Sequence, residues 1–391
     1  MSLRSRAAIA AVFVALIVGA LPALAGEFTD SAGRIVALPP SVNRVMAADP
    51  AAAVLVYVLA PSKLVGWPQH LPASGMPPRY ARLPVTGQLT GANPSATAAT
   101  VTQLHPDLII DSGPVTPERA AFADQISQAT GVPYLLVDNG IDRSPSSLRT
   151  VGRVLGVADR ADDLAGSAEH AINALRGRLL IQQANERPRV YVARGPSGLE
   201  TAVPGSGAAA AIEAAGALNV AASLSPGQTA VTVQQLHDWN PDIIIAEDRG
   251  FYLAARRNSA WANLAAVRGN KLLLEPSEPF GWIDDPAGIN RLIGLYWLSQ
   301  IFYPGDSQDD LRSLMADFYD HFYGIKLTDA QIEAIAKPAG IPPSDTPHLA
   351  ALPPLGTNPT STVPGAVNEP GRRGVLPSAP PVTTPSYLMP K

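Results

Sequence analysis

Nine residues of this chain are placed where they could bind a small molecule. They are Trp67, Gln88, Ser112, Asp138, Arg194, Arg249, Tyr252, Phe280 and Trp282. Most follow predicted strands, and ligands of open α/β sheets bind beyond the carboxyl ends of the strands, so position is the main reason for choosing them. The tryptophans can stack on a flat ligand, and the arginines can neutralise an anionic one through a planar, permanently charged guanidinium.

Each of these candidates also has a purely structural interpretation. Trp67 and Trp282 can simply close hydrophobic core, and Arg194 or Arg249 can be an ordinary solvated surface arginine. Arg291, which lies near a predicted helix start, is better explained as a structural brace, so we leave it out of the predicted site.

Other side chains do not form a catalytic or metal-binding pattern. The six histidines show no HxH or HExxH spacing, and His105 and His237 lie near predicted helix ends, where the helix dipole favours them. The stretch "GSGAAA" at 205–210 follows no strand directly and predicts a glycine-rich helix start, whose N-terminus could still bind an anion. No nucleophile elbow is present. We therefore expect no enzyme activity, no metal held directly by protein side chains and no cofactor.

Length and composition predict two domains, and the N-terminal segment predicts a location outside the cytoplasm. A chain of 391 residues with 46% hydrophobic residues can form two domains of similar size, and a net charge of -4 argues against nucleic-acid binding. The N-terminus is typical of a signal peptide at 1–25, with Arg4 and Arg6, an apolar run and a small-residue site ending at Ala25. The chain has no cysteine for lipid attachment or a disulfide. We expect a protein of the periplasm.

The C-terminal segment 338–391 is rich in Pro, Gly, Ser and Thr and lacks hydrophobic periodicity. Such a composition buries too little apolar surface to offset chain entropy, so it predicts a disordered tail. The tail is either a spacer or a tether to another envelope component.

A duplicated phrase indicates two α/β lobes. "VTQLHPDLIID" at 101–111 recurs in lengthened form as "VTVQQLHDWNPDIIIAE" at 231–247. Proline disfavours helix in the residue before it, so each copy predicts a helix that ends where a buried strand begins. Short runs of Val, Leu and Ile alternate with helical or turn-rich segments on both sides, as in parallel sheets. We expect an N-terminal lobe at 26–143 and a C-terminal lobe at 188–337.

The segment between the lobes, 144–187, predicts a helical connector. Its residues 161–183 place apolar side chains at helical spacing and would span about 35 Å, enough to cross a domain. The predicted fold is therefore α/β, with two Rossmann-like lobes joined by one long helix and a ligand cleft between them. A helical connector predicts only a small hinge motion.

Several segments resemble the periplasmic substrate-binding proteins of ABC importers for iron complexes and cobalamin. The similarity covers about residues 28–325, and it rests on the paired "LHPDLII" and "WNPDIII", on 33–67, on 191–221, on 261–276 and on "PFGWIDDPAGINRLIGLYWLSQIFYP" at 279–304. The resemblance implies a monomer that captures an iron complex, such as a ferric siderophore or haem, and delivers it to a permease in the inner membrane.

One departure from the family bears on the permease partner. Members usually carry a glutamate seven residues before the proline of each Pro-Asp pair, and these two glutamates dock onto arginines of the permease. Ala99 and Gln234 stand at those positions here. Two alternatives therefore stay open beside iron-complex import: a binder of a molybdate-like oxyanion or other metal complex, and an envelope sensor or interaction protein that kept the fold without transport.

Overall fold

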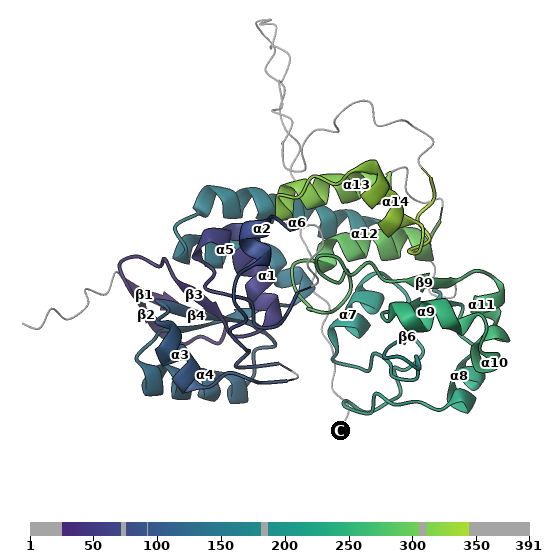
Figure 1. Ribbon diagram of the computed structural model, residues 1–391, viewed down its shortest axis with the longest axis horizontal. Coiled ribbons are helices and arrows are strands. Elements are labelled where there is room, and N and C mark those ends of the chain that lie inside the picture. Colours follow the sequence, from purple (N-terminus) through teal and green to yellow (C-terminus); the bar gives the residue numbers. More distant parts are fainter. Residues whose placement is uncertain (1–25, 72–75, 92, 181–186, 305–309, 344–391) are drawn as a thin grey trace, which may run out of the picture. The chain divides into compact units, whose positions relative to one another are not determined.

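The computed structural model of the protein describes residues 26–71, 76–91, 93–180, 187–304 and 310–343 (Figure 1). The predicted signal peptide and most of the predicted tail lie outside these ranges. Within them, no helix combines the length and the apolar character that a membrane crossing requires.

The first lobe is built on a parallel sheet in the order β3 (Val45–Ala47), β4 (Leu108–Gly113) and β5 (Tyr134–Asp138). All residues of β3 and β4 are buried, as in a sheet covered on both faces. An antiparallel pair, β1 (Gly26–Thr29) and β2 (Ile35–Leu38), precedes it. The helices of this lobe are α1 (Pro50–Leu59), η1 (Pro61–Lys63), α2 (Pro78–Ala81), α3 (Ala98–Leu104), α4 (Pro117–Thr130), η2 (Ile141–Arg143) and α5 (Ser144–Val154).

Two short apolar runs, 63–67 and 83–87, form only isolated bridges, Val45 with Leu64 and Trp67 with Val85. Pro68 and Pro84 interrupt these segments and cannot donate to a ladder, which explains why each run forms only a bridge.

The Pro-Asp junctions explain why the phrase is duplicated. His105 caps the carboxyl end of α3, and Asn240 caps that of α8 (Val233–Trp239), both with positive φ. A buried strand starts directly after each Pro-Asp pair. The carboxylate of Asp107 accepts hydrogen bonds from the backbone N–H groups of Asn43 (2.7 Å) and Arg44 (2.8 Å). Asp242 accepts one from Arg189 (2.8 Å) in the same way. Each aspartate therefore fixes the start of the neighbouring strand.

Replacing either aspartate by alanine should lower the free energy of unfolding by about 1–2 kcal/mol, because charge-assisted hydrogen bonds to backbone N–H groups are lost at a partly exposed site. Urea unfolding measures this change. Asp124→Ala is the control, since Asp124 is 70% exposed in its ion pair with Arg34 and should change stability by less than about 0.5 kcal/mol. Equal effects at all three positions would contradict the role given to the Pro-Asp carboxylates.

The second lobe repeats the architecture with four parallel strands. Their order is β7 (Leu218–Asn219), β6 (Arg189–Ala193), β8 (Ile243–Ala246) and β9 (Leu272–Leu274). Beside α8, its helices are α7 (Gly207–Ala214), α9 (Arg249–Ala255), α10 (Ser259–Ala262) and α11 (Ala265–Arg268). The helical pattern at 258–269 is thus divided into two short helices, because Leu264 adopts an extended conformation between them.

The connector helix is α6 (Ala158–Leu179), whose 22 residues span about 33 Å. It contacts α5 in the first lobe and α12 (Arg291–Phe302) in the second. The apolar stripe that predicted the helix, including Leu164, Ala168 and Ile172, is buried. One continuous cluster of buried apolar residues runs through α1, α6 and α12. Apolar packing therefore joins the two lobes, in addition to the covalent connection through α6. The expected small hinge motion stays a prediction.

The last described part of the chain packs onto the second lobe. It contains α13 (Leu311–Phe318), the π-helical turn η4 (Tyr319–Tyr323) and α14 (Asp329–Ala336). Beyond the predicted domain end at 337, Pro338 accepts a hydrogen bond from the backbone N–H of Leu274 (2.9 Å), and Trp297 donates to the carbonyl of Ala339 (2.9 Å). Folded structure therefore continues past residue 337. The carbonyl of Pro338 accepts from the last residue of β9, and the carbonyl of Ala339 accepts from the buried indole N–H of Trp297.

Candidate functional site

A cavity of about 250 Å³ lies between the two lobes, beyond the carboxyl ends of β3, β8 and β9. The first lobe contributes Pro50, Val54 and the segment from Trp67 to Leu71, and the second contributes Glu247, Ser277, Pro279, Phe280, Asp285 and Pro286. This is the place where α/β proteins bind ligands, because the loops after the strands meet there.

Aromatic side chains form the apolar wall of the cavity. The rings of Trp67 and Phe280 lie 5.9 Å apart at 48°, and Tyr57 packs behind both of them. The indole N–H of Trp67 donates to the carbonyl of Tyr80 (2.8 Å). That bond satisfies the polar edge of Trp67 and fixes the ring in place. Trp67 and Phe280 are 3% and 2% exposed and belong to the buried core, so they close the core and line the cavity with little exposed surface.

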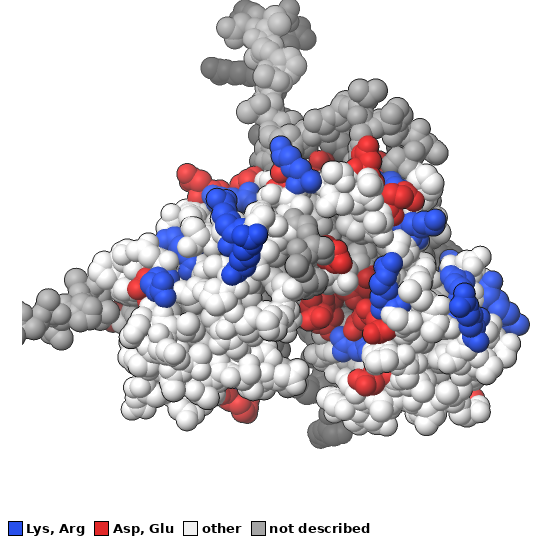
Figure 2. Space-filling model, viewed as in Figure 1, with Lys and Arg blue, Asp and Glu red and all other residues white. Residues whose placement is uncertain are grey.

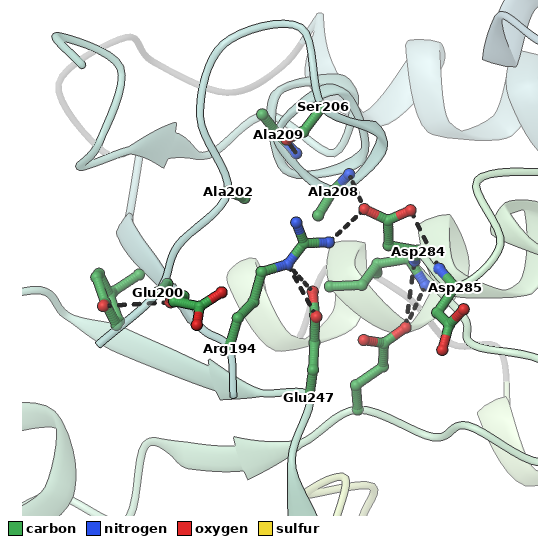
Figure 3. Close-up of polar contacts among 12 residues, drawn as sticks. Arg194, Glu200, Ala202, Ser206, Ala208, Ala209, Glu247, Asp284 and Asp285 are labelled. Atoms are coloured by element: carbon green, nitrogen blue, oxygen red, sulfur yellow. Dashed lines mark hydrogen bonds and ion pairs between the residues drawn. The ribbon is translucent and has the colours of Figure 1, made fainter. Parts of the chain in front are cut away.

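Beside the cavity, an arginine is held between two acids (Figure 3). Arg194, at the end of β6, donates from Nε to both carboxylate oxygens of Glu247 at 2.9 Å. Its Nη2 contacts Oδ2 of Asp284 at 2.5 Å. The positive charge of Arg194 is therefore neutralised within the protein.

Burial changes the proton affinity of this group of residues. It raises the pKa of Glu247 to about 7, with Arg194 opposing the shift and Asp284 and Asp285 adding to it. Burial and the nearby charge of Glu247 also raise the pKa of Glu275 well above its usual value. Attraction to Glu247 and Asp284 outweighs burial at Arg194 and raises the pKa of its guanidinium. Arg194 thus stays charged while Glu247 titrates near neutral pH.

The cavity is consequently acidic. Glu247 and Asp285 line it, and Asp284 lies directly beside it. Figure 2 shows acidic side chains gathered at the junction of the lobes. Although Glu247 carries only part of its charge near pH 7, Asp284 and Asp285 outnumber the single guanidinium of Arg194. The excess of negative charge attracts cations and repels anions.

The comparisons with known proteins agree with this architecture. Residues 59–279 match the model of the family described as periplasmic binding protein. The chain belongs to the periplasmic binding protein family. This confirms the resemblance seen in the sequence, and the two lobes with parallel sheets confirm the predicted fold.

Among proteins of known function, this periplasmic binding protein is similar to the molybdate-binding protein MolA of Haemophilus influenzae. The identity is 29% over 185 residues, which cover 46% of this chain and 52% of that protein. The chain thus matches about half the length of that curated relative.

Three solved structures share the fold. An ABC transporter solute-binding protein from Sulfurospirillum deleyianum has 25% identity and a TM-score of 0.73, over 80% of this chain and 99% of that one. Molybdate-bound MolA has 23% identity and a TM-score of 0.63, over 78% and 99% of the two chains. The haem-binding protein RhuT from Roseiflexus has 22% identity and a TM-score of 0.51, over 68% and 100%.

Within the binding protein, the cavity brings together two of the nine predicted site residues, Trp67 and Phe280. Arg194 lies beside it but is engaged by Glu247 and Asp284. Ser112 and Asp138 instead meet at a smaller cavity of about 20 Å³ between α1 and α5, separate from the first.

The remaining predicted site residues lie apart from the cavity. Gln88 donates to the carbonyl of Asn93 (2.6 Å) within its own loop. Trp282 is fully buried against Trp297, and its indole N–H donates to the hydroxyl of Tyr319 (3.3 Å). Arg249 is exposed at the start of α9, and Tyr252 packs on the core of the second lobe. Core packing and local hydrogen bonds account for Gln88, Trp282 and Tyr252, whereas Arg249 lies at the exposed surface.

The sequence analysis missed the polar residues that line the cavity. They are Gln69, His70, Glu247, Ser277 and Asp285. A signal for Glu247 was present, because it closes the second copy of the duplicated phrase directly after β8. Gln69 and His70 follow Trp67, and Gln69 reaches Asp285 of the other lobe (Nε2 to Oδ1, 3.5 Å). No sequence pattern marks that pairing.

No three His, Asp or Glu side chains in the described ranges converge in a way that could hold a metal ion. The acids around Arg194 are engaged with the guanidinium and with backbone N–H groups.

A second acidic pair, outside the cavity, lies at the carboxyl end of the first sheet. Asp49 caps α1 by accepting from Ala52 (3.0 Å) and also accepts from the backbone of Ser112 (2.8 Å). Arg119 contacts both Asp49 and the buried Asp111. Burial, followed by the hydrogen bond and charge of Asp111, raises the pKa of Asp49 well above its usual value. Asp49 therefore keeps its proton to a higher pH in the folded state than in the unfolded chain.

This proton predicts a pH dependence of stability. Because the folded state keeps the Asp49 proton at a pH where the unfolded chain has released it, the free energy of unfolding should fall as pH rises from about 4 through the raised pKa. Asp49→Asn keeps an oxygen for the helix cap without the titration, at a cost of about 1 kcal/mol for the lost acceptor. Urea unfolding across pH should give a flatter profile for the variant, and parallel profiles would contradict the raised pKa of Asp49.

The positions at which family members carry docking glutamates are equivalent in the structure. Ala99 and Gln234 are both exposed, and each is the second residue of a helix with a threonine capping box, α3 and α8. Gln234 donates to Asp238 of its own helix (2.8 Å). The alignment of these positions is therefore supported, and neither offers a carboxylate.

Proposed function

We propose that this protein is the solute-binding component of an ABC importer, acting in the periplasm, and that it captures a compact iron complex in the cavity between its lobes. The observation that carries the proposal is the cavity itself, where Trp67 and Phe280 face Glu247 and Asp285 beyond the strand ends of two lobes. An aromatic wall suits the organic shell of a chelate, and the acidic side suits a complex without net negative charge.

The size of the cavity favours a compact complex. Its volume of about 250 Å³ lies just below the roughly 300–1,000 Å³ of sites for drug-sized ligands. A small ferric siderophore or a fragment-like chelate suits this space better than the wide, flat haem macrocycle. The fixed packing around α1, α6 and α12 gives the lobes little freedom to open further.

The relative MolA is named as a molybdate-binding protein, which makes an oxyanion the natural rival ligand. The charges around the cavity argue against it here. Arg194 is neutralised by Glu247 and Asp284, and Asp285 adds a further negative charge at the cavity wall. An oxyanion would have to approach three carboxylates.

The test is calorimetric titration of the protein with a panel of ferric chelates of different charge and size, together with haem, cobalamin and molybdate. We expect the tightest binding from a compact neutral or cationic ferric chelate, and a loss of about tenfold or more with Trp67→Ala. Arg249→Gln, at an exposed position away from the cavity, is the matched control. Absence of binding to every ferric chelate would overturn the proposal.

A second candidate is an envelope sensor or interaction protein that binds the ligand without transport. The observation that favours it is the exposed pair Ala99 and Gln234, because neither position carries a carboxylate. Uptake of radiolabelled iron chelate by cells with and without the gene separates the candidates. Equal uptake, with ligand binding intact in the purified protein, would favour the sensor.

A further inference from the structure

The carboxylate of Asp284 lies between two groups that commonly bind anions (Figure 3). Its Oδ2 contacts Nη2 of Arg194 at 2.5 Å and accepts a hydrogen bond from the backbone N–H of Ala208, in the first turn of α7, at 3.2 Å. A guanidinium and a helix N-terminus are the donors that proteins offer to oxyanions. Here both are directed at a side chain of the protein.

The loop that carries Asp284 is anchored at several points. Oε1 of the buried Glu275 accepts from the backbone N–H groups of Ile283 (2.7 Å) and Asp284 (3.3 Å). Gly281 and Gly207 permit the close packing: a Cβ on Gly281 would lie 1.9 Å from the carbonyl oxygen of Asp284, and one on Gly207 would lie 2.3 Å from Cβ of Ala287. The anchored backbone of this loop therefore positions the Asp284 carboxylate beside Arg194.

Asp285 provides a contrast within the same loop. It has the same charge and lines the cavity, but its side-chain contact is with Gln69 of the other lobe (3.5 Å). The two neighbouring aspartates thus differ in position: Asp284 contacts Arg194, and Asp285 lines the cavity.

We propose that Asp284 determines the charge class of the ligand: its carboxylate occupies the anion position between Arg194 and α7, so the cavity takes neutral or cationic complexes and rejects oxyanions. This inference rests on the proposed function, because it concerns the ligand of the same cavity. Removing the Asp284 carboxylate frees Nη2 of Arg194 and the N–H of Ala208 together, which should create an oxyanion site.

The experiment is calorimetric titration of sodium molybdate and sodium sulfate into the wild type, Asp284→Ala and Asp285→Ala. We expect the association constant for molybdate to rise by about tenfold or more in Asp284→Ala, and to change by less than about threefold in Asp285→Ala. The double variant Asp284→Ala with Arg194→Gln should lose the gain. Asp284→Ser, whose short side chain does not reach Arg194 and the N–H of Ala208 together, replaces Asp284→Ala if circular dichroism shows that the alanine variant is unfolded.

Three outcomes would overturn the inference: molybdate binding by the wild type as tight as by Asp284→Ala, an equal gain in Asp285→Ala, or no gain in any folded Asp284 variant. An equal gain in Asp285→Ala would mean that the loss of one negative charge, and not the position of Asp284, raises the affinity for molybdate. The result is separable from the test of the proposed function. A wild type that binds no ferric chelate would overturn that function, whereas a molybdate gain confined to the Asp284 variants would still support the role of Asp284.

Discussion

Trp282→Ala should lower the free energy of unfolding by about 3–5 kcal/mol, the cost of removing a large aromatic side chain from a packed core. Trp282 has 0% of its surface exposed and packs edge-to-face on Trp297, with ring centroids 6.0 Å apart. The change also leaves the hydroxyl of Tyr319 without its indole partner. Urea unfolding with a two-state fit measures the loss.

Two control variants separate the core role of Trp282 from ligand binding. Trp282→Phe keeps most of the apolar contact and should cost about 1–2 kcal/mol while leaving ligand affinity unchanged. Leu253→Ala, at a residue that is 62% exposed, should change stability by less than about 0.5 kcal/mol. A Trp282→Phe variant with native stability but weakened ligand binding would return this residue to the site and contradict its assignment to the core.

Arg194→Met should lower the free energy of unfolding by about 2–3 kcal/mol. The variant leaves Glu247 and Asp284 close together without their shared counter-charge, and breaking a buried ion pair on one side typically costs about 3–5 kcal/mol. The smaller value is expected here because the three side chains keep between 16% and 24% of their surface exposed. Arg249→Gln is the surface control.

The cost of Arg194→Met should grow with pH. Burial already raises the pKa of Glu247 to about 7, and losing Arg194 removes the attraction that opposes this rise. In the variant, the folded state therefore holds the Glu247 proton to a higher pH, and stability continues to fall where the wild type has levelled off. Unfolding at about pH 6 and about pH 8 should show the larger deficit at the higher pH. Adding Glu247→Gln should reduce the deficit, and a pH-independent deficit would contradict this account.

The fold follows from local signals that the sequence carries strongly. Asp49 with Pro50 starts α1, Thr116 starts α4 and Gly131 ends it, each at the residue expected from capping chemistry. The Pro-Asp pairs mark the strand starts, because proline ends the helix before it. The weaker apolar runs around Trp67 and Val85 form only isolated bridges, since prolines near them remove backbone donors.

The site was less predictable because its residues meet through tertiary packing. Trp67, Phe280 and Trp282 have the same local appearance as aromatic residues in predicted loops. All three are buried in the core, but of the three only Trp67 and Phe280 line the cavity. The partners of Arg194 come from the end of β8 and from a loop after β9, so its neutralisation depends on the arrangement of the lobe. A lone arginine in a sequence gives no sign of the acids that surround it.

The account depends most on where the ligand lies. A crystal structure of the protein with a bound ferric chelate, with iron located by its anomalous scattering, tests this directly. We predict a single iron peak inside the cavity between Trp67 and Phe280 on one side and Glu247 and Asp285 on the other. An iron peak on the outer surface of either lobe, or at the smaller cavity near Ser112, would contradict the proposed capture site.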